Sequence, residues 1–154
     1  MSDTTITAQP GTPFIDVIRE FDAPPARVFR AWTEPELVAQ WLGPHGMKME
    51  ILEYDARPGG SYRYIHRNEQ GEFRFRGVFH TVASGERIVQ TFEWEGAPGE
   101  VSLDSAAFED LGGRTRLRTH TVFGSVEARD AAIASGMSHG ITESMERLET
   151  LVEA

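Results

Sequence analysis

The sequence predicts an α+β fold in which a curved antiparallel β-sheet of about six to seven strands wraps around a long C-terminal helix. Two short helical segments follow the first predicted strand, and strand-like segments then recur about every ten to fourteen residues. No helical pattern interrupts these strands over residues 47–123, which favours an antiparallel meander. The only long helical pattern lies at the C-terminus, over residues 125–154.

The C-terminal segment has the period of an amphipathic helix, because its apolar residues recur at steps of three and four. Gly136 and Gly140 lie one turn apart within it. A glycine inside a helix costs about 1 kcal/mol relative to alanine, so something should offset that cost. Two explanations remain open: a close approach or kink at the glycines, or a thin helix that leaves room for a guest molecule. The apolar stripe comprises Met137, Ile141, Met145, Leu148, Leu151 and Val152.

The N-terminal part contains one strand and two short helices. Residues 14–22 alternate between apolar and polar side chains, which predicts a half-buried strand. Two prolines follow directly and favour the first turn of a short helix over residues 24–32. Thr33 then caps a second short helix over residues 36–42, which a glycine-proline segment ends.

Six further strands are predicted after these helices, separated by turns rich in glycine. Large aromatic residues recur on one face of several of them, where they either fill the space under the sheet or line a cavity. The final helix is the only segment long enough to cover that face. The predicted strands span residues 47–56, 61–67, 72–83, 86–95, 100–111 and 114–123.

Length and composition exclude several classes of function. The chain has 154 residues, which predicts a single domain over residues 13–154 behind a flexible N-terminal tail over residues 1–12. It contains no cysteine, which excludes disulfides and thiolate chemistry, and its net charge of −9 disfavours nucleic-acid binding. With neither a leader pattern nor an apolar run of spanning length, we expect no membrane insertion and a cytoplasmic location.

The sequence carries no motif of catalysis or metal binding. Its five histidines do not pair at the spacings of metal ligands, so we expect neither a metal nor another cofactor. His120, in the last predicted strand, faces either solvent or a cavity, where it would anchor a polar part of a ligand. Arg74, Arg76, Arg116 and Arg118 are expected to pair with carboxylates across strands, and binding of a ligand carboxylate or phosphate is the alternative.

Seven short motifs distributed along the chain carry a family resemblance: residues 19–24, 28–37, 40–44, 57–62, 113–117, 127–130 and 135–140. They resemble motifs of START-like, helix-grip (SRPBCC) proteins, and more narrowly the bacterial branch named after the heat-shock-protein-90 ATPase activator. The resemblance spans residues 14–152 and implies the helix-grip fold. It implies less about function, because the superfamily includes lipid carriers, cyclases and hydroxylase subunits. The family commonly has a tryptophan pair where this chain has Trp41 and Leu42.

The preferred hypothesis is a protein that binds a small apolar or amphipathic molecule, without catalysis, in a cavity between the sheet and the final helix. The alternatives are a cyclase- or hydrolase-like enzyme that uses His120 and a carboxylate in the same cavity, or a chaperone-associated interaction module. A homodimer is compatible with each of them. The predicted ligand-binding residues are Trp41, Tyr64, Phe75, Phe92, Trp94, His120, Met137, Ile141 and Met145.

Overall fold

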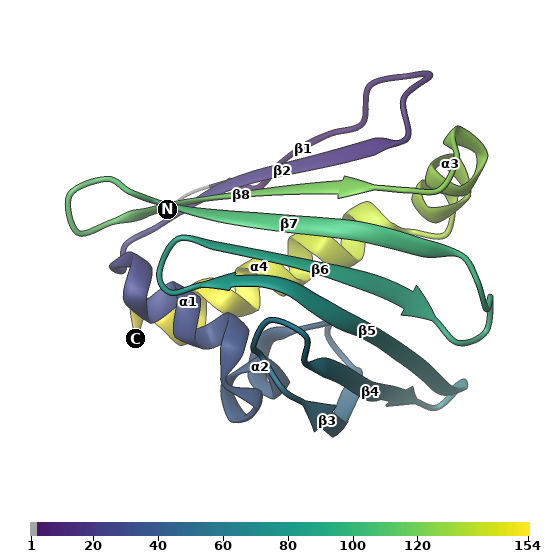
Figure 1. The fold of residues 1–154 in the computed structure, drawn as a ribbon, viewed down its shortest axis with the longest axis horizontal. Helices are drawn as coiled ribbons and strands as arrows, with labels where there is room; N and C mark the ends of the chain where they lie inside the picture. The colour runs from purple at the N-terminus through teal and green to yellow at the C-terminus, as the bar shows by residue number, and fades with distance from the viewer. Residues whose placement is uncertain (1–2) are drawn as a thin grey trace.

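The computed structural model describes residues 3–154, which form one eight-stranded antiparallel sheet and four helices (Figure 1). The predicted α+β class, a sheet around a long C-terminal helix, is confirmed, with one strand more than the expected upper number. The helices are α1 (Pro25–Thr33), α2 (Pro35–Trp41), α3 (Val126–Ala134) and α4 (Met137–Glu153). The strands are β1 (Thr5–Thr7), β2 (Phe14–Phe21), β3 (Lys48–Tyr54), β4 (Ser61–Asn68), β5 (Gly71–Ala83), β6 (Arg87–Trp94), β7 (Val101–Asp110) and β8 (Thr115–Val122).

The strand order is β1-β2-β8-β7-β6-β5-β4-β3, so the N-terminal strands join the meander through its last strand. Figure 1 shows α4 running along one face of this sheet, with α1 and α2 near one end of the helix and α3 at the other. We call the sheet face turned toward α4 the inner face and the opposite face the outer face. The alternation of side chains along each strand decides which residues belong to each face.

The additional strand, β1, lies inside the segment expected to be a flexible tail over residues 1–12. Thr5–Thr7 pair with β2 in antiparallel register. The inward side chain of Arg19 on β2 donates a hydrogen bond of 2.8 Å to Thr4 Oγ1 and forms an ion pair of 3.0 Å with Glu149 on α4. Three residues are too few to show a period-two pattern, so this strand could not be predicted from the sequence. Residues 1–2 of the expected tail lie outside the described residues.

The C-terminal helical segment is divided into α3 and α4 at Gly136. This glycine has a φ of 94°, in the left-handed region that glycine adopts without strain, and it precedes the first residue of α4. The kink considered for the glycine pair is therefore present at Gly136. Gly140 lies inside α4, and a Cβ atom at this position would meet nothing within 4 Å.

Apolar packing holds α4 against α1, α2 and β2. The helix buries Met145, Leu148 and Val152 in the main hydrophobic cluster. Fully burying such a side chain stabilises a fold by roughly 1.5–3 kcal/mol. The buried indole of Trp41 on α2 donates a hydrogen bond of 2.7 Å to the carbonyl oxygen of Ala31, which joins α2 to α1 beneath α4.

Polar contacts hold the middle of α4 to the segment that follows α2. The Ser144 hydroxyl accepts a hydrogen bond of 2.9 Å from the backbone N–H of Gly43. Arg147 donates to the carbonyl oxygens of Gly43 and Gln40 at 2.9 and 3.0 Å. Because these contacts satisfy backbone groups at the end of α2, they fix the position of α4 beside this helix.

The outer face is charged, and its arginines pair with carboxylates across strands. Arg76 contacts Glu93 at 3.0 Å, and Glu109 contacts Arg118 at 2.9 Å and Arg116 at 3.8 Å. This arrangement agrees with the expected cross-strand pairing of Arg76, Arg116 and Arg118. Arg74 instead lies 3.9 Å from Glu72 on its own strand. Exposed pairs add little to stability, so their main effect is to leave a solvated face with balanced charge.

Position 77 of β5 has no room for a side chain on the inner face, so a substitution of Gly77 tests how this face is packed. A Cβ atom there would collide with the ring of Tyr62 and the carbonyl oxygen of Thr91, which accepts the Tyr62 hydroxyl hydrogen bond. We therefore expect Gly77→Ala to lower the free energy of unfolding by about 1–3 kcal/mol in urea titrations. Gly140→Ala is the control, and it should leave stability unchanged or raise it by up to about 1 kcal/mol. Equal midpoints for Gly77→Ala and the parent would contradict this packing.

Candidate functional site

The inner face of the central strands contains both apolar and polar side chains. On β7, the residues that point inward are Ser102, Asp104, Ala106 and Phe108, because Ala106 and Phe108 are buried and successive side chains alternate. Asp104 thus points to the same side as the hydrophobic core. A carboxyl group in this position requires a specific explanation.

Burial on the inner face is uneven. On β7, Asp104 is half-buried although Ala106 and Phe108 are buried. On β8, Thr121 is half-buried although Leu117 is buried. The closest backbone contacts of α4 are with α1, α2, α3 and β2. We call the half-buried group the inner patch, and it consists of Phe75, Gln90, Phe92, Asp104, Thr121 and Ile141.

A polar row crosses the inner patch at its centre. Gln90 on β6, Asp104 on β7 and Thr121 on β8 lie directly opposite one another in the strand register. Burial raises the pKa of Asp104 to about 6, and a hydrogen bond from Thr121 acts in the opposite direction. Asp104 nevertheless keeps part of its surface accessible. A carboxyl group that protein atoms surround but that solvent still reaches is available to a bound molecule.

Tyrosines adjoin this polar row on β4. Burial raises the pKa of Tyr62, the charge of Asp104 adds to that effect, and a hydrogen bond from Gln90 opposes it. The pKa of Tyr64 is raised chiefly by burial, and then by the charges of Tyr62, Tyr54 and Asp104. Both phenols therefore stay neutral at physiological pH, and Asp104 is the group in this cluster that changes its charge near neutrality.

An aromatic stack forms the wall beside the polar row. The rings of Tyr62 and Tyr64 are stacked at 6.0 Å between centroids. Tyr64 and Phe75 are stacked at 5.3 Å, and Phe75 and Phe92 are also stacked at 5.3 Å. The stack therefore runs across β4, β5 and β6 and ends in two half-buried rings, Phe75 and Phe92. Such a surface can pack against an apolar molecule of varied shape.

The nine predicted ligand-binding residues fall into five groups in the structure. Trp41, Tyr64 and Met145 are buried in the main hydrophobic cluster, and Phe75, Phe92 and Ile141 are half-buried beside it. Met137 is half-buried at the first residue of α4. Trp94 is 43% exposed at the end of β6, where its ring packs over Gly96. His120 lies on the other face of the sheet.

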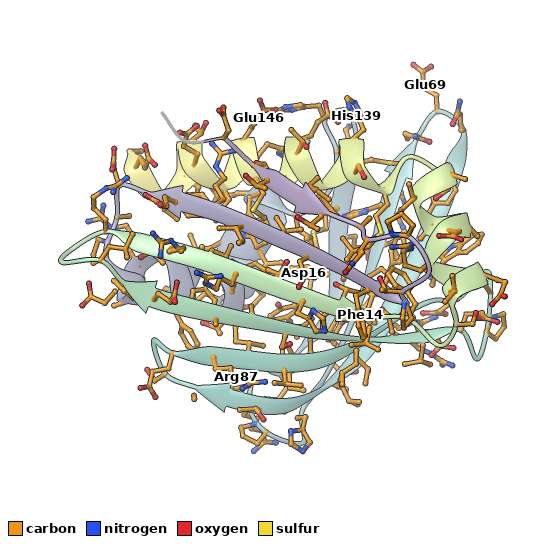
Figure 2. All side chains as sticks on the ribbon, turned by 90° about the horizontal axis from the view of Figure 1, so that it is seen from above. Phe14, Asp16, Glu69, Arg87, His139 and Glu146 are labelled. Atoms are coloured by element: carbon orange, nitrogen blue, oxygen red, sulfur yellow. The ribbon has the colours of Figure 1, made fainter. Side chains whose placement is uncertain are left out.

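The position of His120 corrects the expectation that it contacts a ligand beneath α4. Its partner in register is Asp16 on β2, whose neighbours Ile15 and Val17 are buried toward the core. Asp16 and His120 therefore point outward, and His120 Nδ1 lies 2.6 Å from Asp16 Oδ1. A shallow groove of about 420 Å³ surrounds this pair. Figure 2 shows Asp16 on β2 and Arg87 on β6, which both line this groove.

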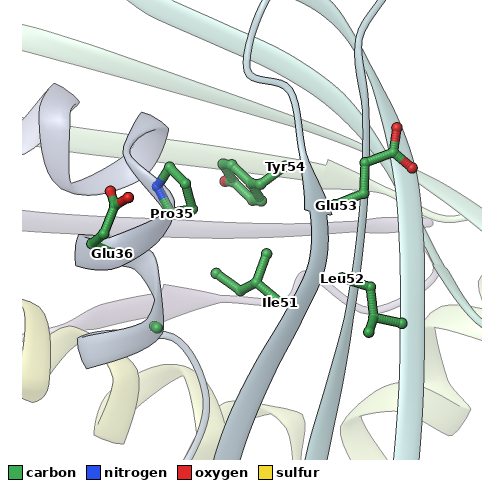
Figure 3. Close-up of a pocket in the computed structure, with 7 residues that line it drawn as sticks. Pro35, Glu36, Ile51, Leu52, Glu53 and Tyr54 are labelled. Atoms are coloured by element: carbon green, nitrogen blue, oxygen red, sulfur yellow. The ribbon is translucent and has the colours of Figure 1, made fainter.

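A second shallow groove of about 370 Å³ lies between α2 and β3. Figure 3 shows the side chains of Ile51 and Tyr54 pointing toward α2, with Pro35 opposite them. The Tyr54 hydroxyl donates a hydrogen bond of 2.8 Å to the carbonyl oxygen of Trp32, so its polar atom is already satisfied. No cluster of polar groups converges on this groove comparable to the row at Asp104.

Sequence reasoning missed Asp104, Gln90 and Thr121 as functional residues. The available signal was the alternation in β7, where Asp104 shares a face with Ala106 and Phe108. The sequence did place Gln90 on the same face as Phe92. Only the strand register shows that Gln90, Asp104 and Thr121 form one row.

Two features are absent from residues 3–154. No group of three or more histidine, aspartate or glutamate side chains is arranged to hold a metal ion. Within the same residues, no helix combines the length and apolar character needed to cross a membrane.

A long C-terminal helix against one face of a strongly twisted antiparallel sheet defines a START-like, helix-grip domain. The family model described as Activator of Hsp90 ATPase homolog 1-like protein matches residues 22–153, so the chain belongs to this family. The resemblance inferred from the sequence motifs is thereby confirmed. No curated protein sequence matches the chain.

Solved structures from several bacteria share this fold. Protein CV1439 from Chromobacterium violaceum is 28% identical with a TM-score of 0.84, and the match covers 92% of this chain and 98% of that one. A protein from Arthrobacter aurescens is 22% identical with a TM-score of 0.89, covering 97% and 91%. Protein Ms6760 from Mycobacterium smegmatis is 20% identical with a TM-score of 0.87, covering 97% and 96%. These likenesses show the fold.

The raised pKa of Asp104 predicts a pH dependence of stability. Because the folded state binds this proton more tightly than the unfolded state, the wild type loses stability as the pH rises from about 4 to about 6. We expect Asp104→Asn to be more stable than the wild type at pH 7.5, by about 1–2 kcal/mol once solvent access is considered. The difference should vanish near pH 4 in urea titrations.

The comparison with a variant is needed because His66 acts in the opposite direction. Burial, followed by the charge of Arg147, lowers the pKa of His66 to about 4, so this group adds stability as the pH rises through the same window. His66 is present in both proteins, and its contribution cancels in the difference. A difference between wild type and Asp104→Asn that does not change with pH would refute a buried, titrating carboxyl group.

Proposed function

We propose that the protein binds a small hydrophobic or amphipathic molecule at the inner patch, between the sheet and the start of α4. The observation that carries this proposal is that Asp104 and its cross-strand neighbours Gln90 and Thr121 remain half-buried, although they share a face with the core. A packed core leaves few spaces larger than a water molecule. Accessible apolar surface on this face therefore supports a space for a ligand.

The composition of the inner patch supports the same proposal. Small-molecule sites are predominantly apolar and contain a few polar groups that orient the ligand. Here Phe75, Phe92 and Ile141 supply apolar surface, and Asp104 with its row supplies the polar groups. Met137 and Trp94 would extend this wall at the open end of the sheet. The family and its START-like fold are consistent with a ligand-binding domain.

Binding is favoured over the two alternatives by particular residues. An enzyme that uses His120 beneath α4 loses its proposed acid or base, because this histidine and Asp16 form a pair on the outer face. Asp104 is a single titrating carboxyl, without a second acid or base in hydrogen-bonding contact. Only the name of the family supports a chaperone-associated function, and none of the contacts described above does. We therefore propose ligand binding first.

Filling the inner face with a larger side chain tests this proposal. Thr119 is a half-buried inward residue of β8 opposite Ala106, and Ser105 is a half-buried outward residue of β7. We expect the wild type to bind the neutral dye Nile red saturably in fluorescence titrations. Thr119→Phe should weaken this binding by about tenfold or more, equivalent to about 1.4 kcal/mol, because the new ring occupies the ligand space.

The matched control is Ser105→Phe, which adds the same ring to the outer face and should leave dye binding unchanged. Circular dichroism and urea midpoints verify that both variants are folded. Absence of saturable dye binding by the wild type, or an equal loss in both variants, would count against a site on the inner face.

A further inference from the structure

The inner patch contains a carboxyl group without a cationic partner. Within residues 3–154, no ion pair joins Asp104 to a lysine, arginine or histidine. The buried arginines of the fold, in contrast, each have a partner of opposite charge: Arg19 pairs with Glu149 at 3.0 Å and Arg129 with Asp130 at 2.8 Å. The hydrogen bond from the Thr121 hydroxyl is the side-chain contact that stabilises the Asp104 carboxylate.

We propose that the ligand of the inner patch is a cationic amphipath, a primary or secondary amine whose ammonium group pairs with Asp104 and whose apolar body lies against the Phe75–Phe92 stack. This inference rests on the proposed function and specifies the chemical class of its ligand. The structure supports it through the position of Asp104 at the end of an aromatic wall, on a face that α4 leaves partly uncovered.

Charge complementarity is the first reason for an amine. A carboxylate surrounded by protein has lost part of its hydration, and an incoming cation restores a favourable interaction that a neutral or anionic molecule cannot supply. The second reason is the aromatic wall, because the half-buried ring of Phe92 at the end of the stack can attract a nearby cation. The third is the supply of acceptors, since Thr121 and Gln90 flank Asp104 and can each accept an ammonium N–H.

The titratable groups that share the inner face with Asp104 do not change this balance between pH 5 and pH 8. Tyr62 and Tyr64 are neutral throughout, because their pKa values are raised. His66, further along the inner face, is neutral because burial lowers its pKa to about 4. On α4, His139 is exposed and lies 3.5 Å from Glu143.

The inward residues nearest Asp104 on β6 and β8 are Gln90 and Thr121, and those at the start of α4 are Met137 and Ile141, all uncharged. Ionisation of Asp104, with a pKa of about 6, therefore controls the charge of the inner patch. The patch is neutral at pH 5 and carries one negative charge at pH 7.5. An amine with a pKa of about 10 stays protonated at both values, so any change in its binding reports the protein.

The experiment compares three probes with the same ten-carbon chain: decylamine, decanol and decanoate. We expect isothermal titration calorimetry of the wild-type protein at pH 7.5 to give at least about tenfold tighter binding of decylamine than of decanol, with decanoate weakest. At pH 5 the preference for the amine over the alcohol should fall to about twofold or less, because Asp104 is then protonated.

Asp104→Asn assigns the effect to this residue. It should remove the preference for decylamine at pH 7.5 while changing the affinity for decanol by less than about twofold, since the shape of the site is kept. Asp16→Asn is the matched control, because it makes the same substitution on the outer face, and it should retain the full preference. The pH comparison on the wild type provides a second test that depends on no variant.

Each other outcome has a distinct meaning. If the wild type binds decylamine and decanol equally at pH 7.5, the amine assignment is wrong and the proposed ligand-binding function stands. If a preference for decylamine survives in Asp104→Asn, another group recognises the cation and the inference is overturned. If neither these probes nor Nile red binds, the proposed function and the inference both fail.

Discussion

The attachment of α4 to one side of the sheet is the constraint on which the rest of the structure depends. Its C-terminal half is held by buried apolar contacts and, at its end, by Glu153, whose carboxylate accepts a 2.9 Å hydrogen bond from the Asp22 N–H. Ser144 and Arg147 hold its middle to Gly43. The helix therefore lies against α1, α2 and β2, and its buried residues join the same hydrophobic cluster as Phe79, Ile88 and Phe108 of the middle strands. Beyond this cluster, the large rings of Phe75 and Phe92 provide much of the inner face and remain half-buried.

The two faces of the sheet treat their carboxylates differently. On the outer face, Glu93 and Glu109 pair with arginines across the strands, so their charges are balanced locally. On the inner face, Asp104 is largely surrounded by protein and has a raised pKa, and none of residues 3–154 forms an ion pair with it. Carboxylates on the outer face thus form ion pairs that link neighbouring strands, whereas the Asp104 carboxylate on the inner face carries a charge that is not balanced. We infer function from the second case because an unbalanced buried charge is costly to retain.

The sequence was sufficient to predict the fold class, the two short helices and the long C-terminal helix, because proline positions, glycine turns and a 3.6-residue period are local signals. It was insufficient for the polar part of the site. Around His120, the neighbours Thr119 and Thr121 are also polar, so alternation could not decide which face the histidine occupies. That choice is made by pairing with β2, and the row through Asp104 likewise depends on three strands meeting in register. Such information lies in contacts between distant segments.

The central claim is that the inner patch borders an accessible apolar space, and methyl NMR under xenon pressure tests it most directly. Xenon enters apolar cavities without any specific recognition. The account predicts saturable shifts at the methyl groups of Ile141 and Thr121, with little change at Leu148 in the packed core or at Leu103 and Val78 on the outer face. Uniformly small shifts at Ile141 and Thr121, or larger ones on the outer face, would contradict it.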